Sequence, residues 1–161
     1  MLKLPHLTFG YTLIEILVVL SIMGLLFGAG YANLRGFQRR QSLSDAAKQV
    51  QGDLRYAQEL ALSGQKPSNV NCTGANNLNG YLFTVLSSSN SYEIRASCTG
   101  AVPPPASKSV TLPVGLSITS TLSSLLFKVL GNGTNNATIS VSQQGNSVPV
   151  TITVSSGGQI Q

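Results

Sequence analysis

Hydrophobic and polar positions change their pattern twice along this chain. Residues 16–34 contain no charged residue, and the apolar run extends back to Tyr11 with one acid, Glu15. As a helix, this run is long enough to cross a hydrocarbon core of about 30 Å. A cleaved secretory signal is a poor alternative, because its apolar core spans about 7–15 residues and a small-residue cleavage site follows it. We therefore expect residues 11–34 to form a transmembrane helix.

A second helical pattern follows the first without a break. Apolar residues recur there at spacings of three and four, as on one face of an amphipathic helix. They are Leu43, Ala47, Val50, Leu54, Ala57 and Ala61. The charged residues expected on the other side are Asp45, Lys48, Asp53, Arg55 and Glu59. Ser63 and Gly64, with Pro67 beyond, are a typical stop, so the sequence predicts one helix from Tyr11 to Leu62.

From Tyr81 onward the hydrophobic period changes to two, as in half-buried strands. Tyr81, Phe83 and Val85 alternate in one expected strand, and a hairpin loop over residues 87–90 leads to the next. The apolar positions of that next strand are Tyr92, Ile94 and Ala96. Further strands are expected at residues 110–112, 115–120, 125–130, 138–141 and 148–154, with turns at 131–133 and 144–146. In the last strand one face carries Val148, Val150, Ile152 and Val154.

These elements predict an α+β protein. Six or seven short strands favour an antiparallel arrangement, in two packed sheets, against the second half of the helix. The expected divisions are an apolar helix half over residues 11–34, an amphipathic half over 35–63 and a β-rich globular domain over 64–161. The outline resembles a lollipop, with the helix as its stick.

The composition argues for an exported protein. Only 9% of the residues are charged although 42% are hydrophobic, whereas cytosolic enzymes carry about 25% charge. The net charge of +5 does not indicate nucleic-acid binding, because one basic cluster lies immediately after the apolar run, where lipid headgroups would meet it. That cluster is Arg35, Arg39 and Arg40. The charged residues beyond Lys66 are Glu93, Arg95, Lys108 and Lys128.

Glu15 is the most informative residue of the apolar segment. An acid inside such a span costs about 2.5–3.5 kcal/mol on insertion scales, so some interaction must offset this cost. One interpretation places the carboxylate near the end of the helix, where it reaches the membrane interface. The other is that Glu15 meets a specific cation once the helix has left the lipid.

Residues 9–15, FGYTLIE, resemble the class III signal of type IV pilins and pseudopilins. In that family a prepilin peptidase cuts after the glycine and methylates the new amine. The resemblance implies a leader of residues 1–10, cleavage between Gly10 and Tyr11, and N-methylation of Tyr11. It also implies that Glu15 pairs with the N-terminal amine of a neighbouring subunit in the filament core. The family has Phe as its usual first mature residue, and Tyr11 departs from that.

The resemblance also implies partners and a location. The partners are other pilin or pseudopilin subunits, the prepilin peptidase, an inner-membrane assembly platform, and membrane lipid before assembly. The chain would cross the bacterial inner membrane once, with a cytoplasmic N-terminus and the C-terminal domain outside, and then enter a filament. The positive-inside rule favours the opposite orientation, because three arginines follow the span and Lys3 alone precedes it. We follow the family, whose peptidase processes leaders at the cytoplasmic face.

Later segments resemble a narrower family. Residues 54–61, LRYAQELA, are similar to the helix end of the H-type minor pseudopilins of type II secretion and of the T-type fimbrial minor pilins, the GspH/FimT family. Its closing strands are similar to residues 126–128, 133–134, 152–154 and 157–158. The implied function is that of a structural minor pilin or pseudopilin in a type II secretion or type IV pilus machine.

Two alternative functions stay open. The chain could be a tip subunit that binds DNA or a surface, in natural transformation or adhesion. A cluster of Arg95, Lys108 and Lys128 would favour DNA binding. Against it, T-type relatives implicated in DNA uptake end in a Gly-Arg tail, whereas residues 158–161 read GQIQ. The other alternative is a major pilin.

The sequence offers little for catalysis or metal binding. Cys72 and Cys98 bracket the first hairpin and, in an exported domain, are expected to form a disulfide, with two free thiols as the alternative. His6 is the only histidine and lies in the leader, so we expect no metal and no cofactor. Ser63 and Lys66 match S-x-x-K without a K-T-G partner motif, and no carboxylate pair suits acid–base chemistry. We expect no enzyme activity.

Overall fold

The structure is a computed structural model that describes residues 10–67, 72, 77–100, 102–131, 133–145 and 148–161, with the backbone alone at 29–35. The chain divides into two compact units, Met1–Arg40 and Gln41–Gln161. The leader expected over residues 1–10 lies outside the described residues except for Gly10.

Helix α1 runs over Leu13–Ser63, so the helix predicted from Tyr11 to Leu62 is confirmed with a slightly later start. It ends where Gly64 takes a φ of 62°, a left-handed conformation that glycine adopts without a Cβ clash. The Gly64 N–H donates to the Ala61 carbonyl oxygen at 3.2 Å and closes the last turn.

The buried face of α1 in the second unit is the predicted apolar stripe. Its six residues are each at most 5% exposed, and they are Leu43, Ala47, Val50, Leu54, Ala57 and Ala61. The expectation that Asp53 lies on the opposite, solvent side is wrong, because this residue is only 6% exposed. A buried carboxylate is tolerated when it is hydrogen-bonded, and two side chains from the strands donate to Asp53.

Four strands form the first antiparallel sheet, in the order β3-β2-β1-β5. These strands are β1 (Leu78–Leu86), β2 (Ser91–Cys98), β3 (Ala106–Thr111) and β5 (Ser124–Lys128). The predicted hairpin loop is confirmed between β1 and β2, where η2 (Ser87–Ser89) leads into Asn90 at a φ of 47°.

Three strands form the second antiparallel sheet, in the order β4-β6-β7. They are β4 (Leu116–Ser120), β6 (Ala137–Gln143) and β7 (Val150–Val154). The end of the chain folds back along β7, where Ile160 forms an antiparallel bridge with Val154. This return was not expected from the sequence.

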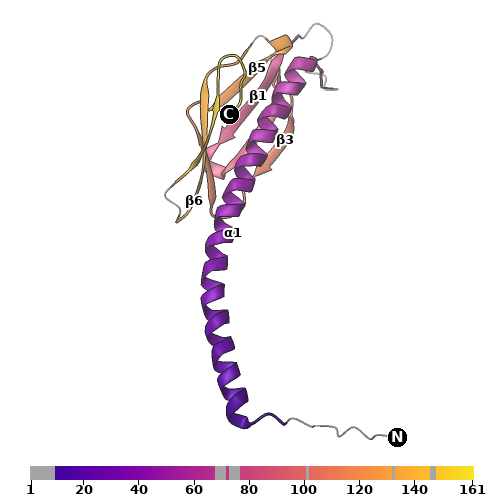
Figure 1. The fold of residues 1–161 in the computed structure, drawn as a ribbon. Coiled ribbons are helices and arrows are strands. Elements are labelled where there is room, and N and C mark those ends of the chain that lie inside the picture. The colour runs from indigo at the N-terminus through magenta and orange to yellow at the C-terminus, as the bar shows by residue number, and fades with distance from the viewer. Residues whose placement is uncertain (1–9, 68–71, 73–76, 101, 132, 146–147) are drawn as a thin grey trace, which may run out of the picture. The chain divides into compact units, whose positions relative to one another are not determined.

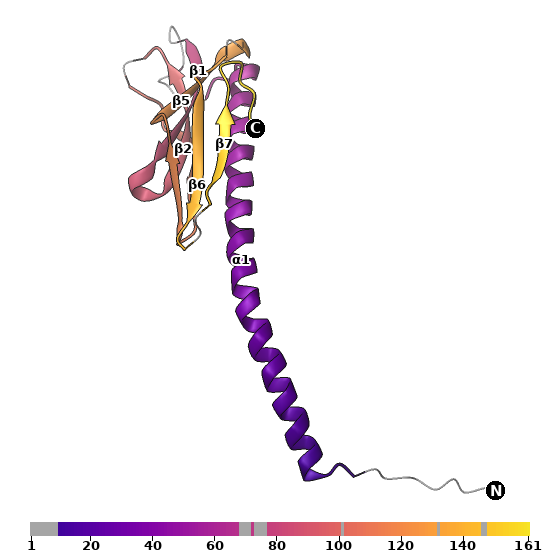
Figure 2. The same cartoon turned by 60° about the vertical axis from the view of Figure 1, so that its left-hand side comes forward.

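One hydrophobic core joins the second unit's part of α1 to both sheets. In Figures 1 and 2 the C-terminal part of the helix lies against strands of the two sheets. Alternation placed the sheet residues of this core correctly: Tyr81, Phe83, Val85, Tyr92, Ile94 and Ala96 are all buried. The rings of Phe83 and Tyr92 stack with centroids 5.0 Å apart. The predicted two antiparallel sheets against a helix are therefore confirmed.

The β1–β2 ladder carries a register shift between Leu78 and Gly80. Gly80 has a φ of 157°, and a Cβ built on it would lie 2.0 Å from the backbone oxygen of Phe127 in β5. Only a residue without a side chain allows β1 and β5 to approach this closely.

Several predicted strand boundaries differ from the structure. β3 begins at Ala106 rather than near Val110. The residues before Val110 form an edge strand with little apolar alternation, so the hydrophobic pattern did not indicate them. β5 stops at Lys128, and the next residues form η3 (Val129–Gly131) with Leu130 at a φ of 56°. In the last strand Ile152 and Val154 are buried, whereas Val148 is 68% exposed and precedes β7.

Candidate functional site

The peptide bond expected to be cleaved lies just before α1. Gly10 and Tyr11 are outside the helix and exposed, and no atom lies within 4 Å of the Cβ position of Gly10. The Tyr11 side chain is 77% exposed. Non-helical, exposed chain is the form in which proteases cut. The structure thus leaves the bond between these two residues accessible.

The start of α1 is built around Thr12 and Glu15. The Glu15 N–H donates to the Thr12 hydroxyl oxygen at 3.3 Å and to its carbonyl oxygen at 3.1 Å. This is an N-cap interaction, and Thr-x-x-Glu is the capping-box signature. Thr12 was not among the residues expected from the sequence, although that signature could have revealed it.

Glu15 is the one acidic residue of the first helical turn. The exposed backbone N–H groups there give the helix end a partial positive charge, which favours a carboxylate. The Glu15 side chain is exposed, and no ion pair to it occurs among the described residues. Its carboxylate is therefore open to a cation from outside the chain.

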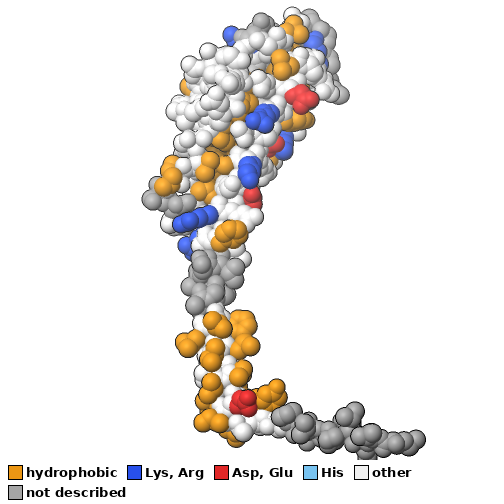
Figure 3. Space-filling view, in the orientation of Figure 1, with side chains coloured by type: hydrophobic (Ala, Val, Ile, Leu, Met, Phe, Trp, Pro, Cys, Tyr) orange, Lys and Arg blue, Asp and Glu red, His pale blue; other side chains and the backbone are white. Residues whose placement is uncertain are grey.

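The side chains that follow Glu15 form an exposed apolar surface. Every large apolar side chain from Leu13 to Phe27 is at least 46% exposed. Figure 3 shows this segment as hydrophobic side chains around one acidic group. Soluble monomers rarely expose apolar patches larger than a few hundred Å², so we expect another apolar surface to cover this one.

In the part of the chain that the structure describes, none of the helices has an apolar stretch of the length needed to span a membrane.

Models of known protein families match both parts of this chain. The model of the family described as type II transport protein GspH matches residues 46–158, which is well over half of the chain. The chain belongs to the GspH family. The prokaryotic N-terminal methylation motif matches residues 8–31, which include the exposed bond and Glu15. No curated protein gives a significant match.

A solved structure has the same fold as this GspH-family chain. It is the minor pseudopilin EpsH from the type 2 secretion system of Vibrio cholerae. The two chains are 14% identical, the match covers 74% of this chain and 94% of EpsH, and the TM-score is 0.53. The pilin-like nature inferred from the sequence, with a helix packed on antiparallel sheets, is therefore confirmed.

Cys72 and Cys98 form the expected disulfide, with their Cα atoms 5.6 Å apart. The bond links the buried Cys72 to the last residue of β2. It closes a loop of chain that includes β1 and its hairpin. Across the described residues, no three His, Cys, Asp or Glu side chains gather into a group that could hold a metal ion.

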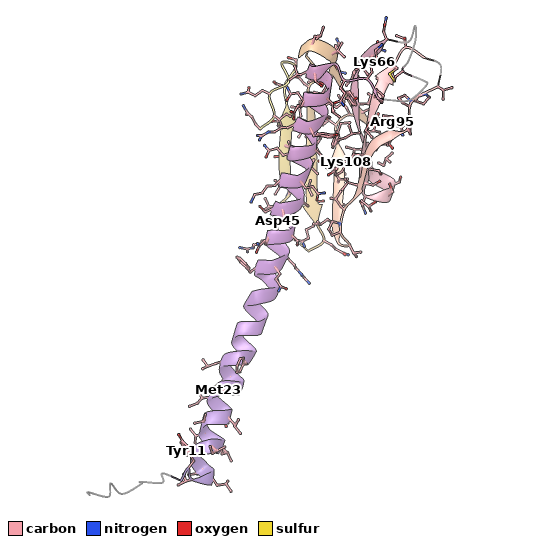
Figure 4. The ribbon with its side chains drawn as sticks, turned by 90° about the vertical axis from the view of Figure 1, so that its right-hand side faces the viewer. Tyr11, Met23, Asp45, Lys66, Arg95 and Lys108 are labelled. Carbon is pink, nitrogen blue, oxygen red and sulfur yellow. A yellow bond between two sulfur atoms is a disulfide. The ribbon has the colours of Figure 1, made fainter. Side chains whose placement is uncertain are left out.

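The three cations that could have formed a DNA-binding cluster lie on three different strands, and two of them are paired with carboxylates. Arg95 pairs with Glu93 at 2.5 Å and Lys108 pairs with Asp53 at 2.5 Å. Figure 4 labels Arg95 and Lys108 in the strands beside α1. Lys128 is exposed on β5, which is separated from the strand of Lys108 by two others, a distance of about 14 Å at the usual strand spacing. These residues do not make a basic patch.

A buried polar cluster links α1 to β2 and β3. The Tyr92 hydroxyl donates to Asp53 Oδ2 at 2.7 Å, and Lys108 Nζ donates to Asp53 Oδ1 at 2.5 Å. Burial raises the pKa of Tyr92 above its ordinary 10.0, and the hydrogen bond and charge of Asp53 raise it further. This cluster was not expected from the sequence, because its three members are far apart in the chain.

Proposed function

We propose that this chain is a structural minor pseudopilin of a type II secretion machine. The observation that carries the proposal is an exposed apolar helix surface that starts with one acid, next to an accessible Gly-Tyr bond. This acid has no ion pair among the residues that the structure describes. Membership of the GspH family and the N-terminal methylation motif support it. The role is mechanical, since the chain supplies a rod and a folded domain to an assembly.

Processing prepares the rod for assembly. A prepilin peptidase cuts between Gly10 and Tyr11 and methylates the new amine, which keeps its positive charge. The amine then lies one turn before Glu15, at the end of the helix where the first N–H groups are unpaired. One helix end thus presents both a cation and an anion to its neighbours.

Assembly matches these two charges between subunits. The amine of one subunit pairs with Glu15 of the next, while the apolar side chains around them pack together. A charge pair is stronger in such a low-dielectric bundle than in water, although desolvation offsets part of this gain. An unpaired Glu15 in lipid is costly. The acid therefore favours the assembled state over the isolated one.

Before assembly, residues 11–34 anchor the chain in the bacterial inner membrane, with the N-terminus in the cytoplasm and the β domain outside. Lipid covers the apolar surface there, and Arg39 and Arg40 follow it at the level of the headgroups. The inner-membrane assembly platform then transfers the subunit into the filament, where other pseudopilins replace the lipid.

The alternative functions lack a supporting observation. A DNA-binding tip subunit would need a basic patch, but the charges of Arg95 and Lys108 are each offset by a carboxylate. A major pilin would be the abundant component of purified filaments.

Replacing Glu15 by Ala tests the proposal. The variant should still be cleaved and membrane-bound, yet its incorporation into filaments should fall at least tenfold, because removing one partner of a buried charge pair costs about 3–5 kcal/mol. Quantitative immunoblotting of sheared filaments measures this fall. Glu59→Ala is the matched control, since Glu59 is an exposed acid on the same helix. Normal incorporation of the Glu15 variant would contradict the mechanism.

A further inference from the structure

Strand β7 is the outer strand of the second sheet, and its free edge already accepts a strand in this chain. Thr153 and Gln161 exchange two backbone hydrogen bonds, of 2.9 Å and 3.0 Å. Ser155 donates to the Gln159 carbonyl oxygen at 3.0 Å. The Gln58 side chain of α1 holds this returning segment through the Gly158 carbonyl oxygen at 2.9 Å. The segment covers only the C-terminal half of the β7 edge.

The other half of the edge, at Thr151, is unpaired among the described residues. Residues two apart in a strand direct their backbone groups to the same side, so Thr151 points its N–H and C=O the same way as Thr153, away from β6. Neither group has a hydrogen-bond partner among the described residues. Unpaired edge groups of this kind are a template for another strand.

These two groups face a groove between β7 and α1 with a volume of about 290 Å³. Ala47, Lys48 and Gln51 line it from the helix, and Val150 and Thr151 from the strand. Val150 is 37% exposed although its side chain is apolar. Lys48 is exposed and has no ion-pair partner in the described part of the chain. We name this feature the β7 groove.

We propose that the β7 groove binds an extended segment of another protein as an additional antiparallel strand. The segment would continue the pairing that the returning residues begin, and turn away where Gln161 lies. Its central residue would exchange both backbone hydrogen bonds with Thr151 and direct its side chain to solvent. The residues on either side of it would face Ala47 and Val150.

This geometry sets the chemistry of the partner segment. The two residues that face the helix should be apolar and the central one polar. The segment should also contain an acidic residue, because the charge of Lys48 has no ion-pair partner among the described residues. Backbone bonds supply affinity in this mode and alternate side chains supply specificity. The groove belongs to the second unit, so its binding does not depend on assembly through Glu15.

A labelled peptide, acetyl-Asp-Val-Thr-Ile-amide, tests the site on full-length protein in detergent micelles. Fluorescence anisotropy should show saturable binding. The same peptide N-methylated at its threonine should bind about tenfold more weakly or worse, because it loses one backbone donor. Thr151→Pro should have a similar effect, since it removes the edge N–H while the β6 ladder stays intact. Thr151→Val keeps that N–H and should bind as the parent does.

Amide hydrogen exchange gives an independent measurement. Saturating peptide should slow exchange at Thr151 at least tenfold and leave Thr153, which is already paired with Gln161, unchanged. Equal binding of the parent and N-methylated peptides, or no protection of Thr151, would overturn the proposal. So would slow exchange of Thr151 in a self-associated protein without peptide, because a second copy would then be the occupant.

Discussion

The buried carboxylate of Asp53 makes a sharp test of how α1 is held on the sheets. Lys108→Met removes the cation that donates to Asp53 Oδ1 and keeps a side chain of similar length. Asp53 then retains one donor, the Tyr92 hydroxyl at 2.7 Å, and stays almost inaccessible to water. Its charge would be only half satisfied.

The expected loss of stability follows from how deeply the two side chains of the ion pair are buried. Breaking a fully buried ion pair costs about 3–5 kcal/mol. The Lys108 side chain is 40% exposed, whereas that of Asp53 is 9% exposed, so solvent already screens part of the attraction. We therefore expect Lys108→Met to lower the free energy of unfolding by about 1–3 kcal/mol.

Urea denaturation of full-length protein in micelles, followed by near-ultraviolet circular dichroism, measures this loss. Asp53→Leu combined with Lys108→Met is the companion variant, because it removes both charges and leaves no buried carboxylate. Replacing a buried pair by apolar residues is often neutral, so the double variant should be more stable than Lys108→Met alone. A loss below about 0.5 kcal/mol in the single variant would refute the reasoning, since that is the range of ordinary surface substitutions.

Two further predictions concern the second unit. The pKa of Tyr92 is raised, so folding favours its protonated form, and that stabilisation is complete below pH 10.0 and is lost as the pH rises above it. Urea titrations between pH 9 and 11 should therefore show a smaller alkaline loss of stability in Tyr92→Phe than in the parent, and equal slopes would contradict this. Replacing Cys72 and Cys98 by Ser should cost about 2–4 kcal/mol, because the unfolded chain loses a cross-link. Alkylation under native conditions should label neither cysteine until a reductant is added, and labelling without reductant would count against the bond.

Local patterns were sufficient to predict the helix, the β1–β2 hairpin and the apolar stripe. Ala57 and Ala61 follow a helical period, and Tyr92 and Ile94 a strand period, and both periods depend only on neighbouring residues. The disulfide was also predictable, because two cysteines in an exported domain have one possible pairing.

What the sequence did not reveal depends on contacts between distant residues. The helical pattern places Asp53 on the solvent side, because nothing in it indicates that β2 and β3 bring Tyr92 and Lys108 to this carboxylate. No alternating pattern in the sequence indicates that Gln161 returns along β7. Leu130 adopts a left-handed φ of 56° that its residue type disfavours. No local propensity encodes such features, which arise only when the sheets assemble.

The candidate site divides in the same way. Gly10, Tyr11 and Glu15 could be predicted as a candidate site because they lie together in the chain at fixed spacing, whereas the β7 groove joins Lys48 to Thr151 across the fold. A motif of neighbouring residues can be recognised from the sequence alone, whereas a groove between a helix and a strand exists only in the folded chain.

The central claim is that processing creates the amine that Glu15 meets in the filament. Mass spectrometry of the N-terminal peptide, from protein extracted from membranes of cells with an active prepilin peptidase, tests it most directly. We predict a mature chain that begins with N-methylated Tyr11. A chain that still carries residues 1–10 in those cells would contradict the account, because no amine would then be free to pair with the acid.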